Sequence, residues 1–143
     1  LIGRRHVRSN NSWLHNSHRL VKGKPRCTLM LHPNTAKAHN IEDGQAVKVT
    51  SRVGQVTINA EVTDELMPGV VSIPHGFGHG RKGVKQKVAQ AHAGVSVNDL
   101  TDDTLIDKLS GNAAVNGVPV TLQAVECVED AAKNTTIDDR VIA

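Results

Sequence analysis

The chain has 143 residues, 38% of them hydrophobic, and a net charge of +3. This length fits one domain with a modest core, and with one Trp, one Phe and no Tyr that core must be aliphatic. No apolar run is long enough to span a bilayer and the first residues show no signal-peptide pattern, which argues against membrane contact by this segment. We therefore expect a β-rich domain of a cytoplasmic protein, with a periplasmic parent protein as the alternative.

Charge is unevenly distributed along the chain. Eight Lys or Arg residues precede the first acidic residue, Glu42, whereas nine Asp or Glu residues and only three basic ones follow from Asp99 onward. This asymmetry predicts that the N-terminal part of the chain meets an anion.

The first sixteen residues, LIGRRHVRSNNSWLHN, predict a short strand followed by a polar loop. Their arginines provide planar forks for phosphate, their asparagines provide paired donors and acceptors for the edge of a heterocycle, and Trp13 offers a flat apolar face. Together they indicate a site for a large anionic ligand. The alternative is an ordinary solvated basic face with Trp13 in the core.

Periodicity and turn residues predict five further strands, over residues 27–31, 45–51, 55–62, 70–74 and 120–125. The second and third of these alternate apolar with polar residues on either side of an Arg-Val-Gly turn, which predicts a hairpin. The fourth is too apolar to be solvated. It ends in the glycine-rich segment HGFGHG, where glycines at alternate positions allow the backbone to approach a ligand closely.

Helices are predicted to be few and short. We expect one over residues 33–41, flanked by His32 and His39 as candidate capping residues, and a helix or turn over 88–93. A third is expected over 104–109, capped by Thr101 or Asp102. Short helices among about six strands favour a mainly β fold, a small barrel, over a doubly wound sheet.

Other kinds of site are less well supported by the sequence. Eight histidines show no familiar metal-ligand spacing, and no Ser or Cys lies in the context of a nucleophile, so neither a catalytic residue nor a metal ligand is assigned. Cys27 and Cys127 are interpreted as buried thiols, although a disulfide between them stays open. A basic nucleic-acid-binding domain is disfavoured because the positive charge is local and aromatic residues are almost absent.

Three segments carry a resemblance to a known family. IGRRHVRSNNSWLHN, HPNTAKAHNIEDGQAVKVTSRVGQVTINAEVTDELMPGVVSIPHGFGH and VNDLTD, in this order and spacing, resemble the C-terminal molybdopterin-dinucleotide-binding domain of the bacterial molybdopterin oxidoreductases. That family includes formate dehydrogenases, nitrate reductases and dimethyl sulfoxide reductases. The resemblance implies a six-stranded double-psi β-barrel over residues 1–126, with a tail or extension over 127–143.

The resemblance also implies a function. The domain would bind and orient molybdopterin guanine dinucleotide, and the isolated domain need not retain it. Molybdenum or tungsten would be held mainly by upstream catalytic domains of the same chain, which are the expected partners. The domain itself would be non-catalytic. A stand-alone double-psi barrel that serves as an interaction module stays the alternative.

Individual residues match the family's cofactor loops. The first loop is matched by Gly3, Arg4, Arg5, Arg8, Ser9, Asn10 and Asn11, with Trp13 and His15 carried over beside them. The second is matched by His75, Gly76, Phe77, Gly78 and His79, and the third by Asn98, Leu100 and Thr101. Relatives carry a Tyr-Lys pair before the final strand, where this chain has SGNAAVNG over 110–117; Asn112 or Asn116 is the candidate contact there. We expect a closed barrel to bring these three loops together.

Overall fold

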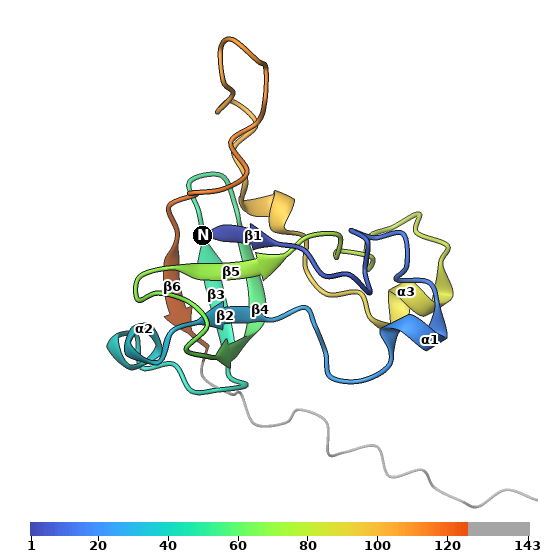
Figure 1. Ribbon diagram of the computed structural model, residues 1–143, viewed down its shortest axis with the longest axis horizontal. Coiled ribbons are helices and arrows are strands. Elements are labelled where there is room, and N and C mark those ends of the chain that lie inside the picture. Colours follow the sequence, from blue (N-terminus) through green and yellow to red (C-terminus); the bar gives the residue numbers. More distant parts are fainter. Residues whose placement is uncertain (126–143) are drawn as a thin grey trace, which may run out of the picture.

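A computed structural model describes residues 1–125 and contains one mixed sheet of six strands (Figure 1). The order across the sheet is β1-β5-β2-β4-β3-β6. The strands are β1 (Ile2–Arg4), β2 (Leu29–Leu31), β3 (Ala46–Thr50), β4 (Gln55–Val62), β5 (Val71–Pro74) and β6 (Thr121–Ala124). Strands β1 and β5 are parallel, as are β2 and β4, and the other neighbours are antiparallel. The predicted mainly β class and the hairpin of β3 and β4 are confirmed.

The helices are short. They are α1 (His18–Val21), α2 (Pro33–Ala38), α3 (Lys87–Ala91) and the 3₁₀ helix η1 (Val97–Leu100). The predicted capping of α2 is confirmed, because His32 Nδ1 accepts a hydrogen bond from the Asn34 N–H at 3.0 Å and His39 is the C-cap. The sequence did not predict α1. In the described part of the chain, every helix is too short and too polar to cross a bilayer.

The core lies where the alternating apolar residues of the strands meet. In β4 the side chains of Val56, Ile58 and Ala60 are buried while their neighbours are exposed, as the period of two requires. All four residues of β5 are buried, Ser72 included, which agrees with the prediction that this strand is not solvated. Complete burial of a Leu such as Leu29 or Leu31 contributes about 1.5–3 kcal/mol.

The prediction of a helix over residues 104–109 is wrong. Residues 102–119 instead form a projecting arm, in which Ile106 and Ala113 make an isolated antiparallel bridge (Figure 1). Asp102 does accept a hydrogen bond from the Thr104 N–H, at 3.0 Å, but it closes a turn rather than capping a helix. Six residues without a surface to pack against are too few to sustain an α-helix.

Two expectations are not decided by the described residues. The ladders end at β1 on one side of the sheet and β6 on the other, without pairing these two strands, so closure into a barrel stays a prediction. The proposed tail over 127–143, with Cys127 and any disulfide it makes, lies outside the described residues.

Candidate functional site

The sheet places the first two predicted loops side by side. Strands β1 and β5 are parallel and in register, so that Arg4 lies beside Pro74 and both strands end at the same edge. The loop after β1 (residues 5–16) and the loop after β5 (residues 75–80) therefore leave the sheet together. The His75 N–H continues the ladder by donating to the Arg4 carbonyl at 3.0 Å.

Glycines permit the close approach of these loops. A Cβ at Gly76, whose φ is +91°, would overlap the carbonyl of Asn11, and a Cβ at Gly3 would overlap the ring of His75. The Gly3 N–H also donates to Asn116 Oδ1 at 2.8 Å. Asn116, one of the two candidates before the final strand, thus contacts β1, in which Gly3 lies.

The second loop contacts residues that precede the third predicted set. Gly78 and His79 both donate their N–H groups to the Ala93 carbonyl, at 2.8 and 3.1 Å, and a Cβ at Gly78 would lie 2.8 Å from that of Ser96. The second loop is thus joined to Ala93 and Ser96, just before the predicted third set, and the expectation that all three loops meet stays a prediction.

The residues predicted in the third segment have different environments. The Asn98 carbonyl accepts hydrogen bonds from the N–H and hydroxyl of Thr101, and Asn98 is exposed. Leu100 is completely buried in the core, so its side chain is a packing residue in this conformation. Only Asn98 and Thr101 of this set present polar side chains near the surface.

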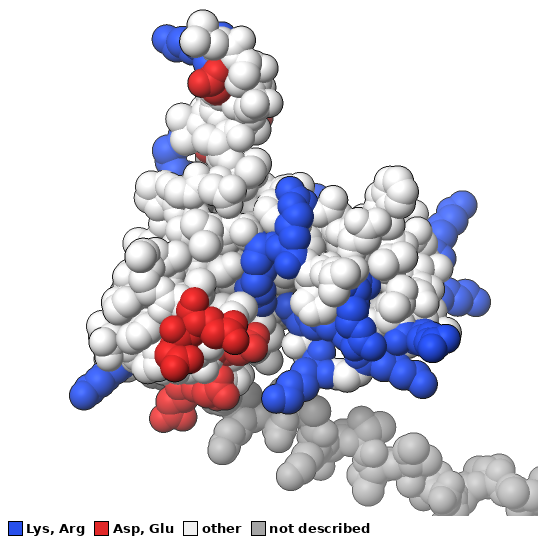
Figure 2. Space-filling model, viewed as in Figure 1, with Lys and Arg blue, Asp and Glu red and all other residues white. Residues whose placement is uncertain are grey.

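A cationic cavity of about 490 Å³ opens between the first loop, the loop before β2 and the end of β5. Figure 2 shows Lys and Arg side chains gathered over the half of the molecule that carries α1 and α3, beside a smaller acidic patch. The cationic residues that line the cavity are Arg4, Arg5, Arg8, Lys24 and Arg26, and the acidic ones are Glu61 and Glu65. An anionic ligand is the chemistry that such a lining favours.

The arginines of this lining differ in how much of their hydrogen-bonding capacity is in use. Arg4 Nη1 donates to the Ser72 carbonyl at 2.6 Å, and its Nη2 donates to the carbonyl and hydroxyl of Thr28 at 2.9 and 2.8 Å. Burial lowers the pKa of Arg4, opposed by the charge of Glu61. Arg4 thus fastens β1 to β5 and β2. Arg5, which donates to Asn11 Oδ1, and Arg8, which reaches the Lys22 carbonyl at 3.4 Å, are exposed.

The asparagines of the first loop shape its backbone. Asn10 and Asn11 have φ values of +41° and +59°, the left-handed region that Asn tolerates better than most residues. Ser9 is buried beneath them, and its carbonyl accepts a hydrogen bond from the Leu14 N–H at 3.2 Å. Trp13 is 83% exposed, which rules out the interpretation of Trp13 as a core residue.

A pair of histidines joins the first two loops. His15 Nδ1 and His79 Nε2 lie 2.8 Å apart, and the His15 ring centroid is 4.2 Å from that of Phe77. Burial lowers the pKa of both histidines, and His79 further lowers the pKa of His15. Burial, with a contribution from Arg5, also lowers the pKa of His75. The hydrogen bond needs a neutral acceptor ring, and these shifts favour it.

Two residues that line the cavity, Lys24 and Arg26, were not predicted from the sequence as site residues. Arg26 Nη1 donates to the Leu20 carbonyl at 3.0 Å and its Nη2 to the Lys22 carbonyl at 2.7 Å, so it supports the loop before β2. The excess of basic residues before Glu42 was the available signal. Among residues 1–125, no three His, Cys, Asp or Glu side chains lie close enough together to hold a metal ion.

Comparisons with known proteins show a shared fold and related sequences. The acetylene hydratase of Pelobacter acetylenicus superposes with a TM-score of 0.68 at 19% identity, covering 86% of this chain and 18% of that one, which shows a shared fold. A tetrathionate reductase subunit of Salmonella typhimurium is 28% identical over 75% of this chain and 12% of its own length. The molybdopterin-containing subunit of the arsenate respiratory reductase of Chrysiogenes arsenatis is 31% identical over 76% of this chain and 13% of its own.

The chain thus spans only 12% and 13% of the length of these two relatives. Residues 1–119 match the family described as "Molydopterin dinucleotide binding domain", which covers every segment of the site built above. The chain therefore belongs to the molybdopterin dinucleotide-binding domain family.

Proposed function

We propose that the chain is the C-terminal domain of a molybdenum- or tungsten-dependent oxidoreductase, and that it binds and orients molybdopterin guanine dinucleotide. When bound, this group would supply the redox chemistry through its metal, which upstream domains of the same polypeptide would hold in the main. The residues of this chain would bind phosphate and ring edges and fix their position. The expected cytoplasmic location belongs to the same proposal.

The residues present fit a dinucleotide. Arg5 and Arg8 are exposed arginines at the mouth of the cationic cavity, with Lys24 facing them, and they suit the two phosphates. Asn11, whose Oδ1 accepts a hydrogen bond from Arg5, and Asn10, its neighbour in the same left-handed turn, would offer amide groups to a heterocycle edge. Arg4 would act through the sheet, by holding the ends of β1 and β5 together.

The observation that carries the proposal is that two loops leave the same edge of the sheet: the loop after β1, which carries Arg5 and Arg8, and the glycine-rich loop after β5. The backbone of Asn11 leaves no room for a Cβ at Gly76, which supports an approach of the two loops that depends on glycine. Loops that merely expose charge to water have no need of such an approach.

Guanosine diphosphate, titrated into the isotope-labelled chain and followed by amide chemical shifts, tests the proposal. We expect shifts confined to residues 3–16, 23–26, 75–80 and 93–101, and binding weakened by roughly tenfold or more in the double variant Arg5→Ala, Arg8→Ala. Lys37→Ala, on the exposed face of α2, is the matched control and should leave binding unchanged.

Separate titrations with pyrophosphate and with guanosine distinguish phosphate recognition from base recognition. No response to any of them at millimolar concentration would contradict the proposal. Salt-dependent binding to DNA without nucleotide preference would instead favour a nucleic-acid-binding domain, for which the exposed Trp13 offers a stacking face.

We further propose that the sheet closes as a six-stranded double-psi β-barrel. Support comes from two backbone hydrogen bonds between Leu1 and Val118: the Leu1 nitrogen donates to the Val118 carbonyl at 2.7 Å, and the Val118 N–H donates to the Leu1 carbonyl at 3.1 Å. These bonds bring the start of β1 to the segment that leads into β6. Slow hydrogen exchange at the Val118 amide would support closure, and exchange at the rate of an open edge would contradict it.

A further inference from the structure

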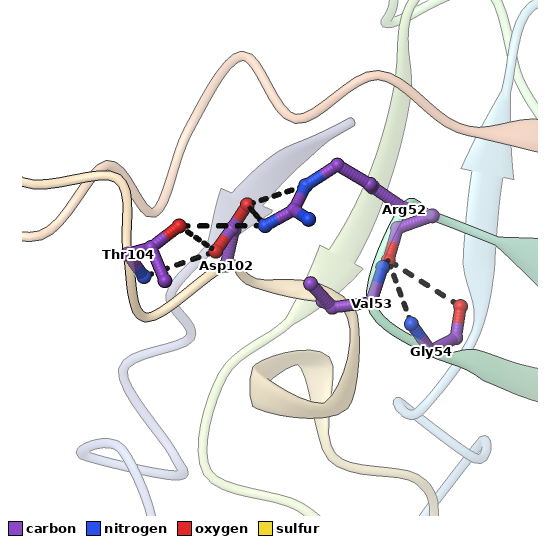
Figure 3. A network of polar contacts seen from close by, with 6 residues as sticks. Arg52, Val53, Gly54, Asp102 and Thr104 are labelled. Atoms are coloured by element: carbon purple, nitrogen blue, oxygen red, sulfur yellow. Dashed lines mark hydrogen bonds and ion pairs between the residues drawn. The ribbon is translucent and has the colours of Figure 1, made fainter.

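The arm formed by residues 102–119 is fixed firmly at its root. Figure 3 shows Arg52, from the turn between β3 and β4, reaching Asp102, and the distance from Arg52 Nε to Asp102 Oδ2 is 2.7 Å. Asp102 Oδ1 accepts from the hydroxyl of Thr104 at 2.7 Å. The other side of the root is held by Val118, which pairs with Leu1. The arm therefore has a defined direction relative to the sheet.

The tip of the arm is also ordered by its own hydrogen bonds. Asp107 Oδ1 accepts from the Leu109 N–H at 3.0 Å and from the N–H and hydroxyl of Ser110 at 2.7 and 2.9 Å. The Asp107 N–H donates to the Asn112 carbonyl at 2.8 Å, and its carbonyl accepts from the Gly111 N–H at the same distance. These bonds close a tight turn and lower the pKa of Asp107.

This ordered arm presents apolar side chains to solvent. Leu105, Ile106 and Leu109 are 52%, 55% and 99% exposed. Leu105 and Ile106 border an open groove of about 510 Å³ that Ala113 and Ala114 complete on the opposite strand of the arm. Figure 1 shows the arm rising away from the sheet and the helices. Ordering these residues costs conformational entropy, which the half-burial of Leu105 and Ile106 offsets only in part and the exposed Leu109 does not offset.

We propose that the arm is a docking element that packs its apolar tip and groove onto a preceding domain of the same polypeptide. This inference rests on the proposed function, which makes the chain the last part of a longer protein. The relatives support that arrangement, since the chain spans only 12% and 13% of their length.

The position of the arm also favours that occupant. The preceding polypeptide would join at Leu1, whose backbone is hydrogen-bonded to Val118 at the root of the arm. A preceding domain would thus emerge next to the arm, at high effective concentration, so that even a small apolar contact would form. Between Thr104 and Ala114 the arm carries only Asp107 and Lys108 as charged residues, and Asp107 is engaged in the tip turn, which suits an apolar recess.

Hydrogen exchange in the longer polypeptide and in the 143-residue chain alone tests the inference. We expect the amides of residues 105–114 to exchange at least tenfold more slowly in the longer polypeptide. The double variant Leu105→Asp, Leu109→Asp should abolish that protection. Met67→Asp, which places the same charge on a 68% exposed residue between β4 and β5, is the control and should retain it.

Three results would overturn the inference. One is equal exchange of the arm in both proteins, and another is protection that the Asp variants leave intact. The third is protection in the 143-residue chain that rises with its concentration together with dimer formation in sedimentation, which would make a second copy the occupant. The arm variants leave the cationic cavity unchanged, so the guanosine diphosphate titration fails or succeeds independently of this test.

Discussion

Single residues hold the candidate site together in ways that their side-chain type alone does not reveal. Arg4 is a guanidinium in a basic cluster, yet its hydrogen bonds go to the Ser72 and Thr28 carbonyls rather than outward. Gly76 has no side chain, yet its position decides how close two loops come. These roles depend on residues that are distant in the sequence and become neighbours only in the folded sheet, so the local sequence does not predict them.

Replacement of Gly76 by Ala tests the close approach of the two loops. The added Cβ would meet the Asn11 carbonyl and sit at a φ of +91°, so we expect a loss of about 1–3 kcal/mol in the free energy of unfolding, measured with urea. Gly83→Ala is the matched control, because Gly83 has a φ of +97° and no atom within 4 Å of a Cβ. If both variants lose the same free energy of unfolding, the loss comes from backbone strain alone and not from the contact of Gly76 with Asn11.

The His15 and His79 pair predicts a pH dependence of stability. Because the pKa of both histidines is lowered in the folded chain from 6.5, the unfolded chain binds more protons below that pH. The stability contributed by the pair is therefore complete above about pH 6.5 and lost as pH falls below it. Unfolding free energies between pH 7.5 and 5 should fall less steeply in His79→Gln than in the native chain. His18→Gln, at an exposed position, should keep the native slope, and a native slope in His79→Gln would refute the coupling.

At the scale of elements, β2 is the strand on which the sheet depends. It lies between β5 and β4, pairing antiparallel with one and parallel with the other, and both of its leucines are completely buried. The same strand supplies the partly buried Met30 to the cationic cavity on its other face. A three-residue strand thus serves both the core and the site.

Leu31→Ala is expected to lower the free energy of unfolding by about 2–5 kcal/mol, because it leaves a cavity at the centre of the sheet. The measurement is urea unfolding followed by circular dichroism. Met30→Ala, one position along and on the opposite face, should cost clearly less. A larger loss for Met30→Ala would show that the core lies on the other face of β2.

The elements differ in how far the sequence predicts them. Alternation in β3 and β4 and the apolar run in β5 predict strands because each pattern reflects burial, which the fold confirms. Helix α1 has no apolar periodicity that would predict it. Asp102 and Asp107, before and within residues 104–109, close turns, which Asp does as readily as it caps helices. The first two loops were predicted as site segments from their Arg, Asn and Gly residues and from the family resemblance. The support that Arg26 and Asn116 provide comes from contacts that the sequence does not show.

Across the whole molecule, charge is arranged in two regions with different tasks. The basic residues of the N-terminal quarter surround a cavity, whereas the acidic Asp102, Asp103 and Asp107 belong to the arm. The link between arm and sheet is the ion pair of Asp102 with Arg52, whose side chains are 6% and 69% exposed. This pair fixes one side of the arm's root, and the hydrogen bonds of Leu1 with Val118 fix the other.

Acid should loosen that link. The side chain of Arg52, together with the hydroxyl and N–H of Thr104, lowers the pKa of Asp102 from 3.8 to about 2. Its contribution to stability is therefore present above pH 3.8 and lost as pH falls toward 2. Asp102→Asn should be less stable than the native chain at pH 7 and converge with it near pH 2, measured by urea unfolding. Asp64→Asn, at an exposed site, should follow the native curve, and a constant difference for Asp102→Asn would contradict the assignment.

The pairing of Leu1 with Val118 has a consequence for the order of folding. Strand β1 pairs with β5, and Leu1 is hydrogen-bonded to Val118 just before β6. Both partners are synthesised late, so early in synthesis β1 and the site loop after it have nothing to pack against. Closing such distant contacts costs loop entropy before any contact compensates for it, which makes β1 among the last strands to dock. A ribosome-bound chain that stops before residue 71 would therefore already hold the β3–β4 hairpin and still lack the anion site.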